Sequence, residues 1–154
     1  MPGNIELLDH TDGDVADAIY SLFQESYRAE AELIGANDFP PLRRSSNNIA
    51  LSNSSFWGRQ NLNGLVGIIE IEQEPALLQI SSLVVSPRQF RQGIGTSLVT
   101  YILSVLKWQQ AQVQTATANA PAIRLYQNTG FIEQKRWLSK QGIELVLLSK
   151  SNTL

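Results

Sequence analysis

Two glycines separated by one residue, with a threonine after them, give the clearest chemical signal in this chain. They lie in the segment Arg91-Gln92-Gly93-Ile94-Gly95-Thr96, directly before an apolar helical pattern. The first amides of a helix have no acceptor within the helix and lie at the positive end of its dipole. Glycines let an anion approach this backbone closely, and Arg91, Gln92 and the Thr96 hydroxyl flank the loop. We interpret the segment as a cradle for a pyrophosphate group.

A glycine pair before a helix is a weak motif on its own, and it has a purely structural alternative. In that alternative the glycines serve only tight packing between a strand and a helix. A Walker loop is excluded, because the pattern G-x-x-x-x-G-K-[ST] is absent. The dinucleotide-binding fingerprint G-x-G-x-x-G also fails, since Leu98 stands where its third glycine is required.

The elements around this loop follow from the apolar pattern. The run Leu77–Val85 predicts a strand that leads into the loop, and Thr96 is expected to open an amphipathic helix. Residues 56–60 and 65–72 predict two strands joined by a turn at Asn63-Gly64, so that three strands form a meander. The buried stripe of the helix is expected to hold Leu98, Ile102, Val105 and Leu106. One face of the 65–72 strand is expected to hold Val66, Ile68, Glu70 and Glu72.

The remaining elements complete an alternation of strands and helices. Residues 5–8 predict an edge strand, residues 14–33 a helix capped by Thr11 or Asp12, and residues 45–51 a short helix. A strand over 112–118 is expected to make a parallel crossover with the strand before the glycine loop. A short helix with Pro121 in its first turn and a final hairpin over 132–138 and 143–149 follow.

Length and composition fit one domain over residues 1–154. The chain has 154 residues, of which 43% are hydrophobic. It has no cysteine and one histidine, which excludes thiolate catalysis and multi-histidine metal sites. It contains no apolar run of membrane-spanning length and no signal-peptide pattern. We therefore expect a cytoplasmic protein that uses no metal and binds no membrane.

Charge is distributed unevenly along the chain. Residues 1–38 hold nine acids and one base, whereas residues 39–154 hold 11 bases and five acids. An acidic first part would attract a cationic substrate and a basic remainder would suit a phosphate-bearing one, although solvated surface charges are the alternative. No Lys/Arg run with interleaved aromatic residues occurs, so nucleic acid is not expected as a partner.

Two motifs together resemble the GNAT superfamily of N-acetyltransferases. Its acetyl-CoA loop has the form [QR]-x-x-G-x-[GA], which the window 90–95 matches except for Phe90 at the first position. Its second signature is matched by Asn119, Ala122, Tyr126, Gly130 and Phe131. The resemblance implies the GNAT fold, an α/β (α+β) single domain with a mixed, mostly antiparallel sheet of six to seven strands and about four helices. A splayed parallel strand pair would form the acetyl-CoA site.

The resemblance also implies roles for residues of both motifs. The amides of residues 91–96 would hold the pyrophosphate of acetyl-CoA. The pantetheine arm would pair with the strand edge at Leu83, Val84 and Val85, and the Val85 amide would hold the developing oxyanion. Asn119 would bond the pantetheine. Tyr126 would protonate the leaving thiolate as general acid, with core packing as its alternative role.

An acceptor amine arrives as a cation and must lose a proton before it attacks. Glu70 and Glu72, on the strand beside the cofactor strand, are candidates for this base, directly or through a water. Alternating glutamates are also typical of a solvated strand face. The region after the first helix covers the acceptor site in the family, and its candidates are Tyr27, Asp38, Phe39 and Trp57.

We therefore expect an acetyl-CoA-dependent N-acetyltransferase that acts on a primary amine by direct attack in a ternary complex. The absence of cysteine excludes an acyl-cysteine intermediate. The sequence leaves open whether the acceptor is a small molecule or a protein or peptide amine, and whether the protein is a monomer or a homodimer. The alternatives are a non-catalytic CoA-binding or regulatory module, which Phe90 would suit, and a nucleotide-binding protein that uses the same loop.

Overall fold

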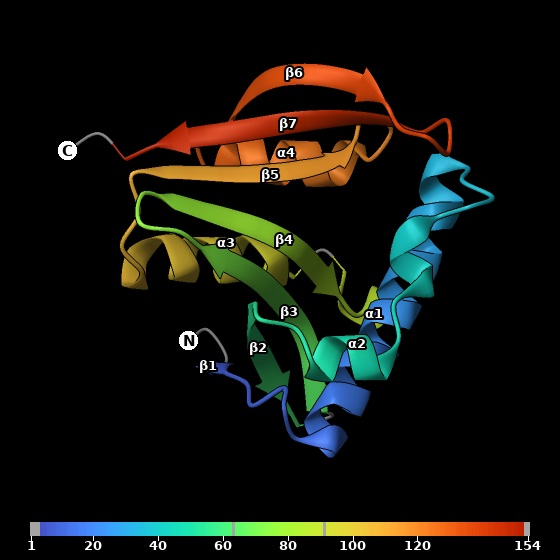
Figure 1. The fold of residues 1–154 in the computed structure, drawn as a ribbon, viewed down its shortest axis with the longest axis vertical. Helices are drawn as coiled ribbons and strands as arrows, with labels where there is room; N and C mark the ends of the chain where they lie inside the picture. Colours follow the sequence, from blue (N-terminus) through green and yellow to red (C-terminus); the bar gives the residue numbers. More distant parts are fainter. Residues whose placement is uncertain (1–3, 63, 91, 153–154) are drawn as a thin grey trace.

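A single seven-stranded sheet with helices on both faces forms the body of the molecule (Figure 1). The computed structural model describes residues 4–62, 64–90 and 92–152. The strands are β1 (Ile5–Leu7), β2 (Ser55–Asn61), β3 (Gly64–Gln73), β4 (Leu77–Val85), β5 (Gln110–Ala116), β6 (Ile132–Leu138) and β7 (Glu144–Ser151). The helices are α1 (Gly13–Ile34), α2 (Ser46–Ala50), α3 (Ile94–Val105) and α4 (Ala120–Asn128), with 3₁₀ turns η1 (Pro40–Arg43) and η2 (Pro87–Gln89).

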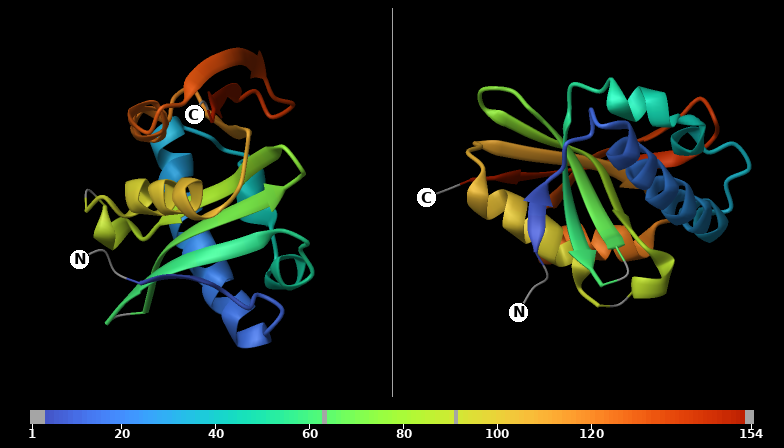
Figure 2. Two further views of the ribbon diagram at one scale, coloured as in Figure 1. Left: turned by 90° about the vertical axis from the view of Figure 1, so that its left-hand side faces the viewer. Right: turned by 90° about the horizontal axis from the view of Figure 1, so that it is seen from below.

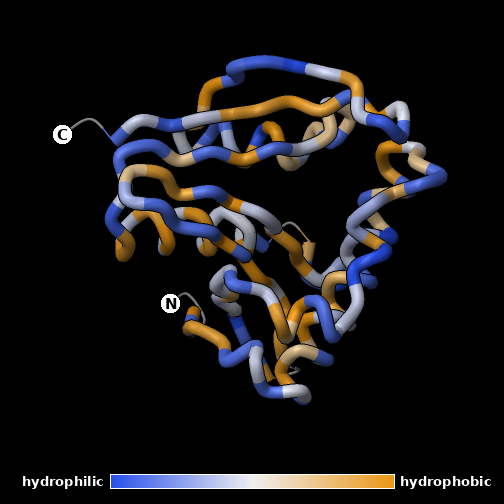
Figure 3. Tube along the Cα trace, viewed as in Figure 1, coloured by the Kyte–Doolittle hydropathy of each residue, from blue (hydrophilic) through white to orange (hydrophobic). Residues whose placement is uncertain are grey.

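The strand order is β1-β2-β3-β4-β5-β7-β6, and only the β4–β5 pair is parallel. This confirms the expected meander, the parallel crossover and the final hairpin. The edge strand β6 is largely hydrophilic along its length (Figure 3), as suits a strand with one unpaired side. The helices of the described ranges include none that is both long and apolar enough to cross a membrane.

Helices α3 and α4 lie on one face of the sheet and α1 and α2 on the other (Figure 2), and each face carries a hydrophobic cluster. One lies under α3 and α4 and includes Leu98, Ile102 and Tyr126. The other lies under α1 and α2 and includes Phe23 and Phe56. The cofactor motifs belong to the first face, while the region expected to receive the acceptor belongs to the second.

The parallel pair opens part of the way along its length. β5 pairs with β4 from Leu77↔Gln110 only to Ile80↔Val113, although β4 continues to Val85 and β5 to Ala116. The register between β3 and β4 shifts at the same level, where Glu70 pairs with Ser82 but Ile71 pairs with Ile80. This places one extra residue on β4 as a bulge, and a bulge bends its strand. The expected splayed pair is therefore present.

A second register shift corrects the expected faces of β3. Arg59 pairs with Gly67 but Gln60 pairs with Leu65, so Val66 is an extra residue on β3. Val66 consequently belongs to the cluster under α3 and α4, while Ile68 belongs to the opposite cluster. The prediction that these two side chains share a face was wrong, because strict alternation fails across a bulge.

Element ends differ from the sequence expectation at three places. The helix after the glycine loop begins at Ile94, two residues before Thr96, because Gly93 is its N-cap in the left-handed conformation. Val105 is the last residue of α3 and is 48% exposed, so it lies outside the buried stripe. β5 ends at Ala116, two residues early, because the Asn119 N–H donates to the Ala116 carbonyl at 3.0 Å and turns the chain into α4.

The first helix illustrates capping at both ends. Its N-cap is Asp12, which accepts from the Asp14 N–H at 2.9 Å, so Thr11 is not the cap. Gly35 ends the helix with a φ of 69°, a conformation that glycine adopts at little cost. The expected turn at Asn63-Gly64 includes Asn63, which lies outside the described residues.

Candidate active site

The start of α3 presents main-chain donors to open space. Gly93 caps the helix with a φ of 73°, and a Cβ at this position would meet no atom within 4 Å. The Ser97 N–H donates to the Gly93 carbonyl at 2.9 Å. The three earlier amides, those of residues 94–96, have no acceptor within the helix. These donors at the positive end of α3 can bind an anion, as the sequence predicts.

The side chains that flank Gly93 at this loop lie at the protein surface. Phe90 is 51% exposed, and Gln92 and Thr96 are also exposed. Gly95 has a different role from Gly93, because a Cβ there would lie 2.8 Å from Leu125 Cδ1 of α4. The packing alternative therefore applies to Gly95, whereas Gly93 supplies the backbone conformation. Arg91, expected beside the anion, lies outside the described residues.

The second part of the site is the open edge of β4. The Ser86 N–H donates to the Val66 carbonyl at 2.8 Å. This bond decides which residues of β4 are hydrogen-bonded to β3 and which alternate residues are not. In this pattern the main-chain groups of Leu83 and Val85 point away from β3, toward the gap left by β5. Those of Val84 point toward Ile68 of β3, so Val84 contributes a buried side chain but no edge amide. Two of the three predicted edge residues therefore offer pairing groups.

The α4 residues of the second motif lie beside this gap. Asn119 is the N-cap of α4, and its Oδ1 accepts from the Ala122 N–H at 3.2 Å. Tyr126 is 4% exposed and packs against the Phe131 ring at 5.6 Å. Burial raises the pKa of Tyr126, and the nearby Tyr27 and Glu30 act in the same direction. Tyr126 thus keeps its proton and can donate a hydrogen bond across the working pH range.

Helix α1 contributes side chains to the same gap from the opposite face of the sheet. Tyr27 is buried, and its hydroxyl lies near Ser82 of β4. Burial is the main cause that raises the pKa of Tyr27. Glu30 lies one turn further along α1, and burial raises the pKa of its carboxyl group against a smaller opposing effect of Asn119. The splay is therefore lined by groups from α1, β4 and α4.

Sequence reasoning missed Glu30. It is one of nine acids in residues 1–38, and nothing in its local pattern distinguishes it from its neighbours. Asn119, which acts on the pKa of Glu30, comes from a distant part of the chain. The one available signal was its three-residue spacing from Tyr27, which puts both on one helical face.

The two glutamates expected as base candidates lie in different environments. Glu70 is 3% exposed, and its carboxylate accepts from both Nη atoms of Arg44, at 2.6 and 3.0 Å. It also accepts from the hydroxyls of Ser54 and Ser82. Glu72 is exposed and accepts from the Ser81 hydroxyl at 2.8 Å. Glu70 is thus an ion-pair partner with both oxygens occupied, whereas Glu72 is a surface group.

The expected acceptor-pocket residues do not all come together. Phe39 is buried and packs edge-on against Tyr27 at 5.8 Å. Asp38 is exposed and pairs with Arg43. Trp57 lies on the other face of the sheet, where it packs against Tyr101 of α3 at 6.0 Å. Its assignment to the pocket is corrected, because side chains alternate along β2 and its neighbour Phe56 takes the α1 face.

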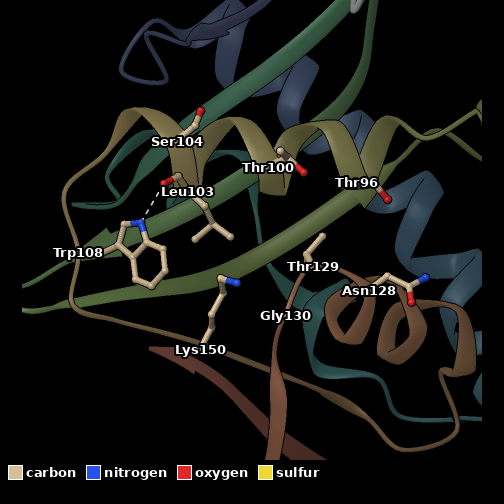
Figure 4. Close-up of a pocket in the computed structure, with 9 residues that line it drawn as sticks. All are labelled: Thr96, Thr100, Leu103, Ser104, Trp108, Asn128, Thr129, Gly130 and Lys150. Atoms are coloured by element: carbon tan, nitrogen blue, oxygen red, sulfur yellow. Dashed lines mark hydrogen bonds between the residues drawn. The ribbon is translucent and has the colours of Figure 1, made fainter. Parts of the chain in front are cut away.

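An open pocket of about 580 Å³ lies between α3 and the end of α4 (Figure 4). Its lining residues are Thr96, Thr100, Leu103, Ser104, Trp108, Asn128, Thr129, Gly130 and Lys150. The pocket begins beside the first turn of α3 and has the Lys150 ammonium as its cation. Across the described residues, no group of three or more His, Asp or Glu side chains is placed to hold a metal ion.

Comparisons with known proteins agree with this geometry. The model of the acetyltransferase (GNAT) domain family matches residues 27–151. The UPF0157 protein YqkA of Bacillus subtilis is 32% identical over 142 residues, which are 92% of this chain and 41% of YqkA. The chain therefore spans less than half the length of this relative.

Solved structures share the fold at low sequence identity. A ribosomal-protein alanine N-acetyltransferase from Escherichia coli superposes with a TM-score of 0.76 at 17% identity, covering 98% of this chain and 94% of its own. PaiA N-acetyltransferase from Thermoplasma acidophilum, solved in complex with coenzyme A, also has a TM-score of 0.76, at 14% identity, covering 97% of this chain and 99% of its own. These superpositions show that the chain has the fold of an N-acetyltransferase domain.

Proposed function

This chain belongs to the acetyltransferase (GNAT) domain family, and from that premise we propose that it transfers the acetyl group of acetyl-CoA to a primary amine by direct attack in a ternary complex. One observation supports this most strongly. At the unpaired edge of β4, the side chains of Leu83 and Val85 lie beside Gly95 in the glycine-capped first turn of α3. An extended, anionic thioester carrier fits a strand edge that ends at an anion site.

Main-chain groups would bind the co-substrate. The amides of residues 94–96 hold the pyrophosphate at the start of α3. The pantetheine arm pairs as an extra strand with the Leu83 and Val85 groups that face the gap. The Val85 N–H then donates to the thioester carbonyl and stabilises the oxyanion that forms on attack. Asn119, at the mouth of the gap, is placed to bond the arm.

The open pocket beside Thr96 suits the nucleotide end of the carrier. Thr96 belongs to both the anion site and the pocket, and Lys150 places a cation in it. We expect Lys150 to attract the 3′-phosphate of CoA. Calorimetry would test this, because removing that phosphate should weaken binding to the wild type about tenfold, the loss expected for one charged contact. For Lys150→Met, the loss of the 3′-phosphate should change the affinity little. An equal loss of affinity in both proteins would show that the 3′-phosphate does not bind beside Lys150.

Tyr126 would act on the leaving sulfur. The raised pKa of Tyr126 makes it a weak acid. Because it stays protonated, its O–H can donate a hydrogen bond to the departing thiolate. The proton follows as the C–S bond breaks.

The two glutamates of β3 are poorly placed as bases for the amine. Glu72 pairs with Gln79, whereas Val85 pairs with Gly67, five positions along β3 from Glu72. At about 3.3 Å per residue the separation along the strand is about 16 Å. Glu70 is nearer but is held by Arg44 and two hydroxyls. We propose that Glu70 holds the bulged segment of β4 in place through Ser82, and that a water would be needed for it to take a proton.

The acceptor is a primary amine of a small molecule or of a protein or peptide. The E. coli structure that shares this fold is named for a protein acceptor, and the acceptor of this chain is to be found by screening. A cytoplasmic location follows from the proposed use of acetyl-CoA, an intracellular metabolite. Monomer and homodimer are both compatible with the site, which is built within one chain.

Tyr126→Phe tests the proposal. Thiol release from acetyl-CoA is measured with a panel of primary amines, and the variant should lose about 100-fold in kcat while calorimetry finds its affinity for acetyl-CoA unchanged. Tyr101→Phe, a half-buried tyrosine on α3 that packs on Trp57, is the matched control and should keep full activity. Wild-type protein that binds acetyl-CoA but releases no thiol with any amine would instead be a non-catalytic CoA-binding module. Tighter binding of ATP than of acetyl-CoA would contradict both.

A further inference from the structure

The last part of β4 lacks one of its two neighbours. β5 pairs with β4 only as far as Ile80, so the segment from Leu83 to Val85 pairs with β3 alone among the described strands. A strand with a free edge has few contacts that fix its position. In the proposed function this segment must meet the thioester while the amides at the start of α3 hold the diphosphate. The distance between these two groups of donors therefore has to be fixed by other contacts.

Two serine hydroxyls anchor this free segment, one at each end. The Ser82 hydroxyl donates to Glu70 Oε1 at 2.9 Å, and the Ser86 hydroxyl donates to Glu25 Oε1 at 3.1 Å. Glu70 belongs to the neighbouring strand β3, whereas Glu25 belongs to α1, beside which β4 ends in Figure 1. Ser86 is 8% exposed, so its hydroxyl has little access to water as an alternative partner. Glu25 thus ties the end of β4 to a helix on one face of the sheet.

The same carboxylate also reaches the turn that follows β4. Arg88 Nη2 donates to Glu25 Oε2 at 3.4 Å, and Arg88 is part of η2, which lies between β4 and the glycine loop. The Arg88 side chain is 82% exposed and that of Glu25 38%, so this ion pair is screened by water and contributes little. The bond from Ser86 is the stronger contact, because it is charge-assisted and its donor is buried. Glu25 therefore acts mainly on the position of Ser86.

We propose that Glu25 is a positioning residue for the co-substrate, an inference that rests on the proposed function. Through Ser86 it holds the end of β4 at a set distance from the start of α3, so that one carrier reaches Val85 and the glycine-capped amides together. A fixed spacing raises the affinity of a ligand that spans both places, because the second contact then needs no further ordering. It adds nothing for a fragment that occupies only one of them.

The negative charge of Glu25 gives this role a distinctive direction. A carboxylate near an anion site repels the anion, so an electrostatic effect alone would make Glu25→Ala bind the diphosphate more tightly. Release of Arg88 from its ion pair would act in the same direction. Loss of the fixed spacing acts in the opposite direction and weakens binding. The direction of the change in affinity therefore separates the two effects.

Binding measurements with one whole ligand and two fragments test the proposal. By calorimetry, Glu25→Ala should bind acetyl-CoA about tenfold more weakly than the wild type, the loss expected for one charge-assisted hydrogen bond. S-acetylpantetheine can occupy only the strand edge, and 3′-phospho-ADP can occupy only the start of α3. By NMR titration each fragment should bind both proteins equally within about twofold. Unchanged or tighter binding of acetyl-CoA, or an equal loss for the fragments, would overturn the proposal.

Matched variants separate the Ser86 bond from the ion pair. Ser86→Ala should reproduce the loss seen in Glu25→Ala, and the double variant should lose no more than either, because both remove one shared contact. Glu25→Gln should keep most of the affinity, since its amide oxygen can still accept from Ser86. Glu32→Ala, which changes an exposed acid of the same helix, is the control. Additive losses, or a larger loss for Arg88→Ala than for Ser86→Ala, would contradict a role through Ser86.

The outcomes also distinguish this inference from the proposed function. A wild type that binds acetyl-CoA, loses that affinity in Glu25→Ala and acetylates no amine would support the positioning role and refute the transfer. A wild type that acetylates amines while Glu25→Ala binds acetyl-CoA equally well would overturn the positioning role alone.

Discussion

The two halves of this site are built from different parts of the chain. In our proposal the cofactor half consists of main-chain groups, namely the amides at the start of α3 and the edge of β4 at Leu83 and Val85. The proposed acceptor half consists of side chains, among them Tyr27 and Phe39, on the face of the sheet that also holds the Arg44–Glu70 pair. Backbone sites depend on conformation and tolerate side-chain change, whereas side-chain sites depend on the identity of each residue. This difference decides which substitutions should matter where.

The largest effect on stability is expected from the acceptor half. Glu70→Ala leaves the Arg44 guanidinium, whose side chain is 22% exposed, without its partner and removes an acceptor from two serines. Breaking one side of a buried ion pair costs about 3 kcal/mol of unfolding free energy. Urea denaturation should show this loss, while Glu72→Ala on the same strand should stay within about 0.5 kcal/mol.

The ion pair itself offers a sharper version of this comparison. If Glu70 mainly positions Arg44 and β4, Arg44→Met combined with Glu70→Leu should recover most of the stability lost in the single variant. Similar stability of Glu70→Ala and Glu72→Ala would mean that the pair does not hold this half together.

The cofactor half should respond to backbone change instead. Gly93→Ala forces a side chain into a φ of 73°, which costs about 1–2 kcal/mol, and turns the first amides of α3 away from the ligand. We expect acetyl-CoA affinity to fall about tenfold by calorimetry. Gln92→Ala, next to it and exposed, should keep the affinity within about threefold, since its side chain is not needed. The reverse order would show that side chains, not amides, bind the carrier.

The smallest expected effect concerns Glu30 and pH. Burial raises the pKa of Glu30 in the folded protein, so ionising it destabilises the fold. Protonated Glu30 therefore contributes its full stability below the pKa of a glutamate in the unfolded chain. This contribution is lost as the pH rises through the higher pKa that Glu30 has in the folded protein. Glu30→Gln should melt at a higher temperature than the wild type at about pH 8 and close to it at about pH 4. Thermal unfolding at the two pH values tests this order of melting temperatures. The opposite order would show that burial does not destabilise the ionised form of Glu30.

The cofactor half was predictable from sequence because its causes are local. A left-handed residue before a helix requires glycine, and Gly93 and Gly95 with the apolar pattern located the loop, α3 and the strand Leu77–Val85. The splay could be expected only through the family resemblance. The bulges that accompany it, at Val66 on β3 and at the serines of β4, arise when strands pair and leave no mark in the alternation of one strand.

The acceptor half was predictable only in part because its residues meet through tertiary packing. Tyr27 and Phe39 were identified and do lie together. Trp57 was placed wrongly, since the face it takes depends on the phase of β2 in the sheet. Glu70 looked like a free strand glutamate, and its partner Arg44 is 26 positions away in the chain. The environment of Glu30 was missed because Asn119, which acts on its pKa, comes about 90 residues later in the chain.

The most direct measurement is a titration of nitrogen-15-labelled protein with acetyl-CoA, following each backbone amide by NMR. If main-chain groups bind the carrier, the largest shifts should fall on Leu83, Val85 and residues 94–96, with Gln92 side-chain signals nearly unmoved. Shifts confined to other surfaces, such as the hollow beside Leu8 and His10, with these amides unchanged, would contradict the account.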